Sequence, residues 1–325
     1  MRVLVTGAAG FIGSHVCERL VGEGLRVAGL DNFDAFYGRE VKEANLAGLR
    51  GKEGFRLVEG DIRDRACVEG ILREEASAGV IHLAAKAGVR GSVADPLGYE
   101  EVNVRGTLVL LEAMRQTGVK RLLFASSSSV YGSRRKLPFS ERDSVDNPVS
   151  PYAATKKAGE LLCHTYHYLY GMDVTCLRLF TVYGPRQRPD LAIHKFVRLM
   201  EAGQALPVYG DGSMARDFTY IDDIVDGMMS AWRECRGYQL YNLGESRPYR
   251  LTNLIAELER VLGRRAEIER LPAPPGEVRQ TFADIRRAVT KLGYSPRVRL
   301  PEGLERFVVW YRQTEGGRSA GGWAG

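Results

Sequence analysis

The sequence predicts an α/β protein built on a Rossmann-type doubly wound parallel sheet, with a smaller α/β lobe in its C-terminal half. Three observations predict this fold. Short apolar runs alternate with longer amphipathic runs through the first half of the chain, a glycine-rich turn (GAAGFIG, residues 7–13) follows the first apolar run, and Asp31 ends the second. Strands that alternate with helices form parallel sheets with helices on both faces.

Five apolar runs are the expected strands: Val3–Val5, Val27–Leu30, Phe55–Val58, Val80–Leu83 and Arg121–Ala125. Helical patterns lie between them, including Ile12–Val21 and Tyr99–Arg115. Asp95-Pro96 and Ser150-Pro151 each predict a helix start, because a capping side chain is followed by proline at the first helical position. Gly118 and Gly171 stand where helices are expected to end.

The chain is long enough for one large domain and a smaller partner, with 325 residues of which 44% are hydrophobic. We expect residues 1–180 to form the dinucleotide-binding domain, to which residues 217–244 return. Residues 181–216 and 245–315 form the expected substrate lobe. Residues 316–325 lack an apolar pattern and are expected to be a flexible tail.

Charge and cysteine content narrow the partners and the compartment. The net charge is +6, but 46 basic and 40 acidic residues are interleaved, which favours a small phosphate-bearing ligand over nucleic acid. Five widely spaced cysteines predict neither a disulfide framework nor a zinc site. His164 and His167 are three residues apart without a third ligand nearby, so no metal is expected. With no apolar run of membrane-spanning length and no signal peptide pattern, we expect a cytoplasmic protein without a membrane partner.

The glycine-rich turn predicts a dinucleotide site. Gly7, Gly10 and Gly13 separate an apolar strand from a helix, and glycine lets the backbone approach a pyrophosphate at the helix N-terminus. Asp31 follows 18 residues after Gly13, at the end of the second strand. A carboxylate there accepts hydrogen bonds from the adenosine ribose and repels a 2′-phosphate, which favours NAD over NADP.

Further cofactor contacts are expected where the third and fourth strands end. Asp61 and Ile62 follow the third strand, and Leu83, Ala84 and Ala85 follow His82 at the end of the fourth. In a doubly wound sheet these positions lie at the carboxyl edge, where ligands bind. Asp61 could contact the adenine, and the two alanines leave room for the cofactor.

A catalytic set is expected after the fifth strand. Ser127 lies in a run of four serines, and Tyr152 and Lys156 follow 25 residues later, four apart on one helix face. A free phenol has a pKa near 10 and is a poor base at neutral pH. Lowering it by about 3 units needs about 4 kcal/mol, which one ammonium about 4 Å away supplies at an effective dielectric constant of about 20. We therefore expect Lys156, with oxidised nicotinamide, to make Tyr152 a general base, and Ser127 to share the substrate proton.

Together, GAAGFIG, Asp31, the serine run and YAATKK resemble the extended short-chain dehydrogenase/reductases over about residues 1–312. DNFDAFYG, AGVRGSV, NPVSPYAATKKAGELL, LFTVYGPRQRPD and RDFTYIDDI are most similar to UDP-glucuronate 4-epimerases within that family. The resemblance implies tightly bound NAD and a homodimer formed through the Tyr152 helix. It adds six residues to the expected cofactor site: Phe11, Ile12, Asn32, Lys86, Asn103 and Ser126.

The resemblance also implies a reaction. Tyr152 takes the proton of the 4-hydroxyl while hydride leaves C4, the 4-keto sugar turns over, and hydride returns to its other face. Related dehydratases carry a carboxylate pair, and related decarboxylases a glutamate, in the segment before VYG. This chain has only Ser128 and Ser129 there. Epimerisation is therefore the expected reaction.

For the sugar, the resemblance points to a UDP-hexuronate. Thr181 is typical of the glucuronate enzymes, whereas enzymes for neutral hexoses usually have Asn. A buried carboxylate needs donors, and the candidates are Ser128, Ser129, Thr181, Arg90 and Arg188. Arg188 could equally bind the diphosphate. Relatives hold the nucleotide diphosphate with residues matching Arg216 and Arg279, and Val208 and Tyr209 are expected to line the uridine pocket.

Two alternatives remain open from the sequence. Lys86 replaces the glutamine common in glucuronate epimerases, so the sequence does not exclude a UDP-glucose 4-epimerase. The basic net charge also leaves a non-catalytic dinucleotide-binding or nucleic-acid-binding module. The complete Ser127, Tyr152 and Lys156 set and the lack of clustered basic residues interleaved with aromatics argue against that module.

Overall fold

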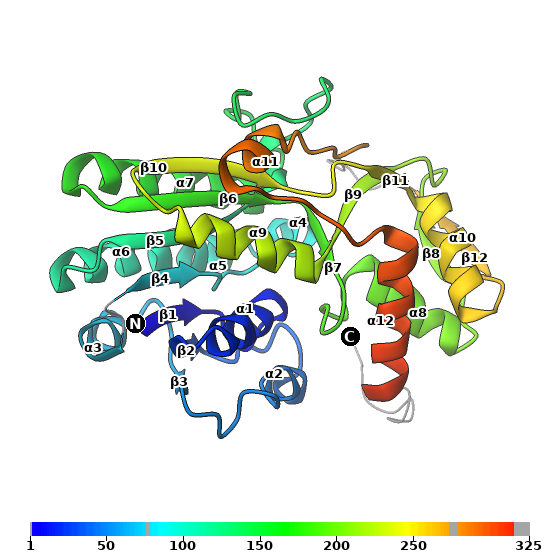
Figure 1. Ribbon diagram of the computed structural model, residues 1–325. Coiled ribbons are helices and arrows are strands. Elements are labelled where there is room, and N and C mark those ends of the chain that lie inside the picture. Colours follow the sequence, from blue (N-terminus) through cyan, green and yellow to red (C-terminus); the bar gives the residue numbers. More distant parts are fainter. Residues whose placement is uncertain (1, 76–77, 273–278, 315–325) are drawn as a thin grey trace.

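The computed structural model describes residues 2–75, 78–272 and 279–314 of the chain. The expected tail at 316–325 lies outside the described residues. The molecule has a large part around one central sheet and a smaller lobe beside it (Figure 1).

The central sheet has seven strands, all parallel, in the order β3-β2-β1-β4-β5-β6-β10. In chain order these strands are β1 (Arg2–Thr6), β2 (Arg26–Asp31), β3 (Phe55–Glu59), β4 (Gly79–His82), β5 (Arg121–Ser127), β6 (Asp173–Leu179) and β10 (Tyr238–Leu243). The strand order reverses between β1 and β4, which opens a crevice at the carboxyl edge. The predicted fold class is confirmed, and each of the five expected strands lies within two residues of an observed one.

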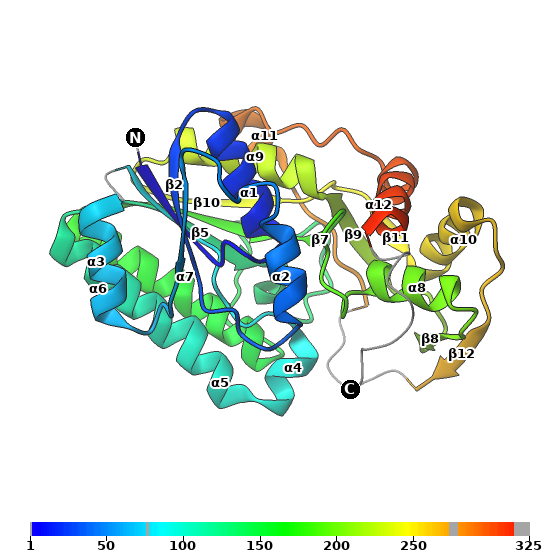
Figure 2. The same cartoon turned by 90° about the horizontal axis from the view of Figure 1, so that it is seen from below.

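Helices cover both faces of the sheet (Figure 2). One face carries α3 (Arg65–Glu75), α6 (Gly106–Thr117) and α7 (Pro151–Tyr170), and the other carries α1 (Phe11–Gly22) and α9 (Ile221–Arg233). Three short helices lie near the carboxyl edge: α2 (Arg39–Asn45), α4 (Val89–Ala94) and α5 (Pro96–Glu100). The sheet is therefore buried on both sides, which explains the continuous apolar character of its strands.

The helix ends follow the sequence signals. Ser150 accepts a hydrogen bond from the backbone N–H of Ala153, and Asp95 accepts one from Gly98, as N-caps do. Gly118 and Gly171 are left-handed at the C-caps, with φ of 76° and 62°.

The helical pattern expected over Tyr99–Arg115 is confirmed, but the helical run is interrupted by a π-turn. The chain forms α5, then a π-helical turn η1 (Glu101–Arg105), and then α6. A π-turn holds an extra residue, which changes the face that later side chains present. The apolar periodicity of the segment does not record that extra residue.

In the part of the chain that the structure describes, the smaller lobe contains two small sheets and three helices. Its strands are β7 (Thr181–Tyr183), β9 (Ala215–Tyr220) and β11 (Pro248–Arg250) in one sheet, and β8 (Leu206–Tyr209) and β12 (Ile268–Leu271) in the other. Its helices are α8 (Ala192–Glu201), α10 (Leu251–Leu262) and α12 (Leu300–Thr314).

The chain passes between the two parts more often than the expected boundaries imply. α9 and β10 belong to the large part, whereas β9 pairs with β7 and β11 in the lobe. α11 (Arg286–Leu292) returns to pack against α9 and β10, although it falls within the range expected for the lobe. The lobe boundaries drawn from the sequence are therefore too simple.

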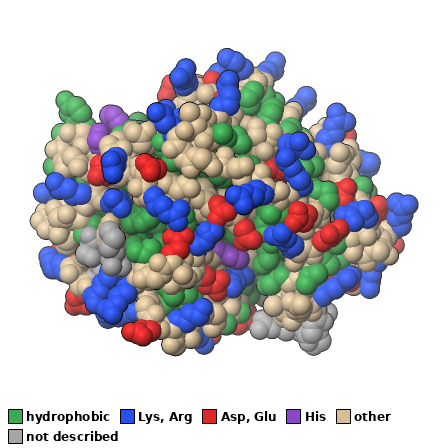
Figure 3. Space-filling view, viewed as in Figure 1, with side chains coloured by type: hydrophobic (Ala, Val, Ile, Leu, Met, Phe, Trp, Pro, Cys, Tyr) green, Lys and Arg blue, Asp and Glu red, His purple; other side chains and the backbone are tan. Residues whose placement is uncertain are grey.

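On the surface, basic and acidic side chains are interspersed over the face shown in Figure 3. Among the described helices, none is both long and apolar enough to cross a membrane.

Candidate active site

The main cavity opens at the carboxyl edge of the central sheet and measures about 490 Å³, a size typical of small-molecule sites. Most of the predicted site residues line it together. They are Gly7, Gly10, Phe11, Ile12, Gly13, Asp31, Asn32, Asp61, Ile62, Leu83, Ala84, Ala85, Lys86, Ser126, Ser127, Ser128, Ser129, Tyr152, Lys156, Thr181 and Arg188.

The turn between β1 and α1 forms one end of the cavity. Gly7 has φ of 71°, and its N–H donates to the Leu30 carbonyl over 2.7 Å. A Cβ on Gly13 would overlap the Gly7 carbonyl, so glycine is required at both positions. The first turn of α1 has no acidic residue, and Gly10 provides no capping side chain. Its N–H groups and positive dipole end therefore suit an anion such as a pyrophosphate.

Carboxylates lie beyond this turn, where β2 and β3 end. Asp31 accepts hydrogen bonds from the N–H groups of Ala9 (3.0 Å) and Phe33 (2.8 Å), and Lys42 lies 3.4 Å away. Asp61 is held by Arg63, which lowers its pKa to about 2. Both aspartates are therefore held in a fixed orientation by hydrogen bonds.

A hydrogen-bonded histidine supports the wall at the end of β4. His82 is buried, with Nδ1 2.7 Å from the Thr6 hydroxyl and Nε2 3.1 Å from the Thr107 hydroxyl. Thr6 also accepts from the N–H groups of Leu83 and Ala84. Burial lowers the pKa of His82 to about 3, so the ring is a neutral structural group rather than a general base.

Asn103 lies behind the cavity wall and is not among the described lining residues, and its expected contact with the cofactor stays a prediction. Its amide accepts from the backbone N–H of Lys86 (2.8 Å) and donates to the Lys86 carbonyl (2.9 Å) and to the Thr155 hydroxyl (3.0 Å). The π-turn η1 carries Asn103. The side chain therefore ties the loop after β4 to α7.

Ser127, Tyr152 and Lys156 meet at the other end of the cavity. The Tyr152 phenol is hydrogen-bonded to Ser127, which also lies 3.2 Å from the Ser129 hydroxyl. Lys156 is buried and donates to the Ala125 carbonyl over 2.8 Å. The edge of the Tyr99 ring packs against Tyr152, with centroids 6.2 Å apart. Tyr99 gave no signal in the sequence, because only the fold brings it to this place.

The electrostatics of the phenol differ from the expectation. Burial raises the pKa of Tyr152 above its usual value, and the Ser127 hydrogen bond and the Arg188 guanidinium oppose that rise. Burial lowers the pKa of Lys156 to about 8. The cation that acts on the phenol in this structure is therefore Arg188, whereas Lys156 was expected to supply that charge.

The end of the cavity beside Ser127 and Tyr152, called the sugar end below because the sugar is expected there, is lined by hydroxyls and one guanidinium. Ser128, Ser129 and Thr181 line it with Arg188, whose Nε and Nη2 bind Asp190 at 3.0 and 2.9 Å. Among the described lining residues, the carboxylates are those of Asp31, Asp34 and Asp61, all after β2 or β3. No described carboxylate lines the sugar end.

Five predicted substrate residues lie outside the cavity lining: Arg90, Val208, Tyr209, Arg216 and Arg279. Arg90 of α4 stacks on the Tyr209 ring at the end of β8, 4.3 Å from its centroid. Val208 is buried within β8. Arg216 donates to the carbonyl of Arg279 over 3.4 Å, and the Arg279 side chain is exposed. The assignment of Arg90 to the sugar carboxylate, and of the other four residues to the nucleotide, stays a prediction.

The structure also adds lining residues that the sequence analysis missed. Phe36 and Tyr37 line the cavity with Asp34 and Lys42. Asp34, Phe36 and Tyr37 follow Asp31 within the DNFDAFYG stretch. Lys42 lies in the next helix, α2. The position of these residues just after a strand, at the carboxyl edge of the sheet, could have identified them as lining residues.

The fold and the site define a dinucleotide-dependent enzyme of the short-chain dehydrogenase/reductase type, with a Ser-Tyr-Lys set at its substrate end. Residues 3–244 match the family described as "NAD dependent epimerase/dehydratase family". The chain belongs to this family. The family and its cofactor are those predicted from the motifs.

Similar proteins cover nearly the whole chain. A UDP-glucuronate 4-epimerase of Thermodesulfobacterium geofontis is 43% identical over 311 residues, which are 95% of this chain and 96% of the relative. The crystal structure of UDP-glucuronic acid 4-epimerase from Bacillus cereus, in complex with UDP-glucuronic acid and NAD, has a TM-score of 0.91 at 39% identity, covering 96% of this chain and 99% of that one. A UDP-glucose 4-epimerase from Thermotoga maritima, with UDP-glucose, has a TM-score of 0.89 at 34% identity, covering 97% and 99%.

Proposed function

We propose that the chain is an NAD-dependent UDP-sugar 4-epimerase that interconverts UDP-glucuronate and UDP-galacturonate. The observation that carries this proposal is the sugar end of the cavity, where hydroxyls and Arg188 surround the catalytic set and no described residue contributes a carboxylate. Elimination or another reaction beyond epimerisation would need such an acid close to the sugar. The names of the similar proteins agree with this proposal.

The residues present fit NAD. The Gly7 to Gly13 turn leaves the space that a Cβ would fill, α1 offers its N-terminus to a pyrophosphate, and Asp31 stands where an adenosine ribose is held. When bound there, NAD would supply the hydride acceptor and donor that a reversible oxidation at C4 of the sugar requires.

The chain's own residues move the proton. Tyr152 takes the proton of the 4-hydroxyl and returns it at the end of the cycle, and Ser127 stabilises the developing oxyanion by a hydrogen bond. Arg188 favours the phenolate form of Tyr152, because its positive charge lowers the pKa of that phenol. Lys156, fixed on the Ala125 carbonyl, holds the nicotinamide side of the site.

Recognition of a hexuronate follows from the donors at the sugar end. A carboxylate at C5 is costly to bury without partners, and Ser128, Ser129, Thr181 and Arg188 all line this region. Arg188 is positioned by Asp190 and by Ala87, whose carbonyl lies 3.4 Å from Nη2. Because Nε and Nη2 already form two parallel hydrogen bonds to Asp190, the Arg188 guanidinium would donate to a sugar carboxylate or a diphosphate chiefly through Nη1.

The test is product analysis by chromatography and NMR after incubation with UDP-glucuronate, UDP-glucose and UDP-xylose in separate reactions. UDP-galacturonate is the expected product, and the Tyr152→Phe variant should form it at least about a hundredfold more slowly. Release of carbon dioxide, or a 4,6-dehydrated sugar from a hexose substrate, would contradict the proposed reaction.

A UDP-glucose 4-epimerase is the second candidate. Lys86, which lines the cavity and binds Asp95 over 2.7 Å, replaces the glutamine expected in glucuronate enzymes. The similar Thermotoga maritima structure holds UDP-glucose. Turnover of UDP-glucose at a kcat/KM equal to or above that for UDP-glucuronate would favour this candidate.

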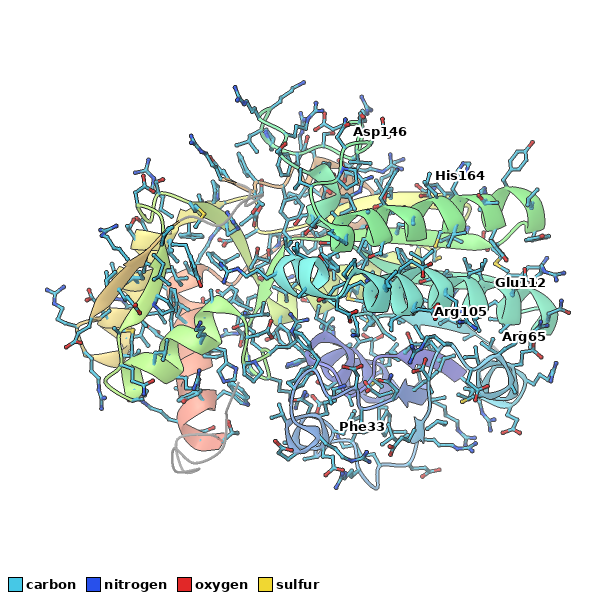
Figure 4. The ribbon with its side chains drawn as sticks, turned by 180° about the vertical axis from the view of Figure 1, so that it is seen from behind. Phe33, Arg65, Arg105, Glu112, Asp146 and His164 are labelled. Atoms are coloured by element: carbon cyan, nitrogen blue, oxygen red, sulfur yellow. The ribbon has the colours of Figure 1, made fainter. Side chains whose placement is uncertain are left out.

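We further propose that two copies pair through α6 and α7. These helices lie side by side across one face of the molecule, with Glu112 on α6 and His164 on α7 (Figure 4). Leu161, Tyr168 and Leu169 of α7 are all more than half exposed, and a row of apolar side chains on a helix pair is typical of a subunit interface. Analytical ultracentrifugation should give a dimer for the native chain and a monomer for Leu161→Glu/Leu169→Glu. A monomeric native chain would contradict this pairing.

We propose the cytoplasm as the compartment. Four of the five cysteines are buried, and all five are free thiols. Free thiols in this number suit a reducing compartment. Cell fractionation followed by detection of the chain tests the proposal.

A further inference from the structure

Three consecutive residues at the end of β5 each contact a different residue of α7. The Ala125 carbonyl accepts from Lys156 (2.8 Å), the Ser126 hydroxyl donates to Glu160 (2.6 Å), and Ser127 is hydrogen-bonded to Tyr152. Tyr152, Lys156 and Glu160 are spaced by four residues and so share one face of the helix. Two of these three contacts hold the catalytic residues Tyr152 and Lys156, and the third holds Glu160.

Glu160 is buried with an arginine from the neighbouring strand. Glu160 and Arg178 are 2% and 3% exposed. Nε and Nη2 of Arg178 each donate to a separate carboxylate oxygen over 2.8 Å. Arg178 of β6 is the register partner of Ser126 in β5. One carboxylate thus joins β5, β6 and α7 immediately behind the cavity wall.

The Arg178 guanidinium extends the contact toward β10. It lies 4.8 Å from the centroid of the Tyr131 ring, and the Tyr131 hydroxyl donates to Asn242 over 2.7 Å. Tyr131 belongs to η2 (Ser128–Tyr131), the 3-10 turn that carries the serines of the sugar end. Glu160 therefore contacts Ser126 at the end of β5, and Arg178 contacts Tyr131 in the serine turn η2.

We propose that Glu160 is a positioning residue for proton transfer: paired with Arg178, it holds the Ser126 hydroxyl and so fixes the end of β5 against α7, with Ser127 facing Tyr152. Glu160 does not contact the cofactor or the substrate, and it acts through Ser126. The consequence for turnover rests on the proposed epimerase function. A misplacement of about 1 Å in such a site lowers a rate by as much as about a hundredfold.

Two double variants separate this role from general support of the fold. Replacing both charges avoids leaving a buried unpaired ion, which is the main cost of breaking such a pair. Glu160→Met/Arg178→Met removes the acceptor of Ser126. Glu160→Gln/Arg178→Met retains an amide oxygen at that place, so the two variants differ chiefly in the Ser126 hydrogen bond.

We expect Glu160→Met/Arg178→Met to lower kcat by about 10- to 100-fold with KM changed by less than about threefold. Glu160→Gln/Arg178→Met should recover kcat to within about threefold of the native value. Native kcat in the methionine variant, or equal losses in both variants, would overturn the proposal. If the methionine variant does not fold, Ser126→Ala decides: a folded Ser126→Ala protein with native kcat overturns it as well.

Tyr166→Phe is the matched control on the same helix. It removes the hydrogen bond from Tyr166 to Glu112 near the other end of α7, so Tm should fall while kcat stays native.

Titration of the Tyr152 phenol by absorbance, as the difference between each protein and its Tyr152→Phe counterpart, gives a readout that needs no substrate. A higher phenol pKa in the methionine variant supports the proposal even where no UDP-sugar is turned over, and an unchanged pKa opposes it.

Discussion

At the residue scale, the chemistry of Tyr152 depends on groups that oppose the rise in its pKa caused by burial. Burial favours the neutral phenol, and the Ser127 hydrogen bond and the Arg188 charge favour the phenolate. Arg188 lies over the Phe36 ring and is bound by Asp190. Its charge is therefore held at a fixed place beside the phenol, whatever part of the substrate it also binds.

Arg188→Met should move the activity of the enzyme to higher pH. Without the guanidinium, the pKa of Tyr152 rises, because a nearby positive charge no longer favours the phenolate. The acidic limb of the kcat profile should then shift upward in pH, and activity at neutral pH should recover in part on raising the pH. The profile of kcat against pH with saturating UDP-glucuronate measures this shift. Arg186→Met is the matched control from the same loop, since Arg186 binds Glu18 outside the cavity lining.

His82 gives a second prediction, which concerns stability. Its pKa is lowered to about 3 in the folded protein, from an ordinary value of 6.5. Between these values the unfolded chain binds the proton and the folded protein does not, so stability is lost as pH falls from 6.5 toward 3. The loss over the whole of this range is on the order of 5 kcal/mol for this fully buried ring.

His82→Gln should remove most of that dependence, since an amide can contact Thr6 and Thr107 without titrating. Urea unfolding of both proteins at several pH values between 7 and 4 measures the difference in the free energy of unfolding. His15, whose pKa is lowered to about 4, titrates in both proteins and cancels from the comparison. A constant difference over this range would show that His82 is not the titrating group.

At the element scale, α7 packs closely against β5 at Gly159. Gly159 faces the Phe124 ring, and a Cβ at this position would overlap that ring. Gly159 lies between Lys156 and Glu160, so any outward movement of the helix strains the contacts of both. The close approach is thus part of how the catalytic helix is placed.

Gly159→Ala should therefore destabilise the protein and lower kcat together. Overpacking of this kind costs about 1–3 kcal/mol. Gly70→Ala, in the middle of α3, is the matched control: nothing lies within 4 Å of its added Cβ, and alanine in place of glycine inside a helix should stabilise by about 0.5–1 kcal/mol. Thermal unfolding and kcat of both variants measure the effects. Native kcat in Gly159→Ala would mean that the helix can shift without affecting the site.

The sequence predicts elements whose causes are local. The glycine spacing, the Ser150 and Asp95 caps and the position of Asp31 all depend on neighbouring residues, and the structure places them as expected. The contact between Glu160 and Arg178 depends on the register of two strands and a helix, which no short motif records. The glutamate four residues after Lys156 was a visible signal, but its partner was not.

Other features depend on irregular geometry. The π-turn η1 rotates Asn103 behind the cavity wall, and the apolar periodicity around it is that of an ordinary helix. Arg90 was expected at the sugar carboxylate and Tyr209 at the uridine, yet they stack on each other from different parts of the molecule. Contacts of this kind require the fold to be known first.

At the scale of the whole molecule, the large part is completed by residues from the second half of the chain. β10 pairs with β6 along its whole length, and α9 covers the sheet beside α1. Ile224, Met228 and Met229 of α9 are buried against that face. Residues 1–180 therefore contain the catalytic set and the glycine turn, but not the elements that cover β6 and one face of the sheet.

We expect the fragment 1–180 not to fold by itself, and the whole chain to unfold in one cooperative transition. Without β10 the hydrogen-bonding edge of β6 is open, and without α9 the apolar face beside α1 meets water, both of which favour aggregation. Circular dichroism and the fluorescence of Trp232, on α9, should give coincident unfolding curves for the whole chain. Trp310→Phe, with Trp323 outside the described residues also replaced by phenylalanine, leaves Trp232 as the single reporter. A soluble, monomeric fragment 1–180 that binds NAD would contradict this expectation, because it would place all of the stability needed for cofactor binding in the first half of the chain.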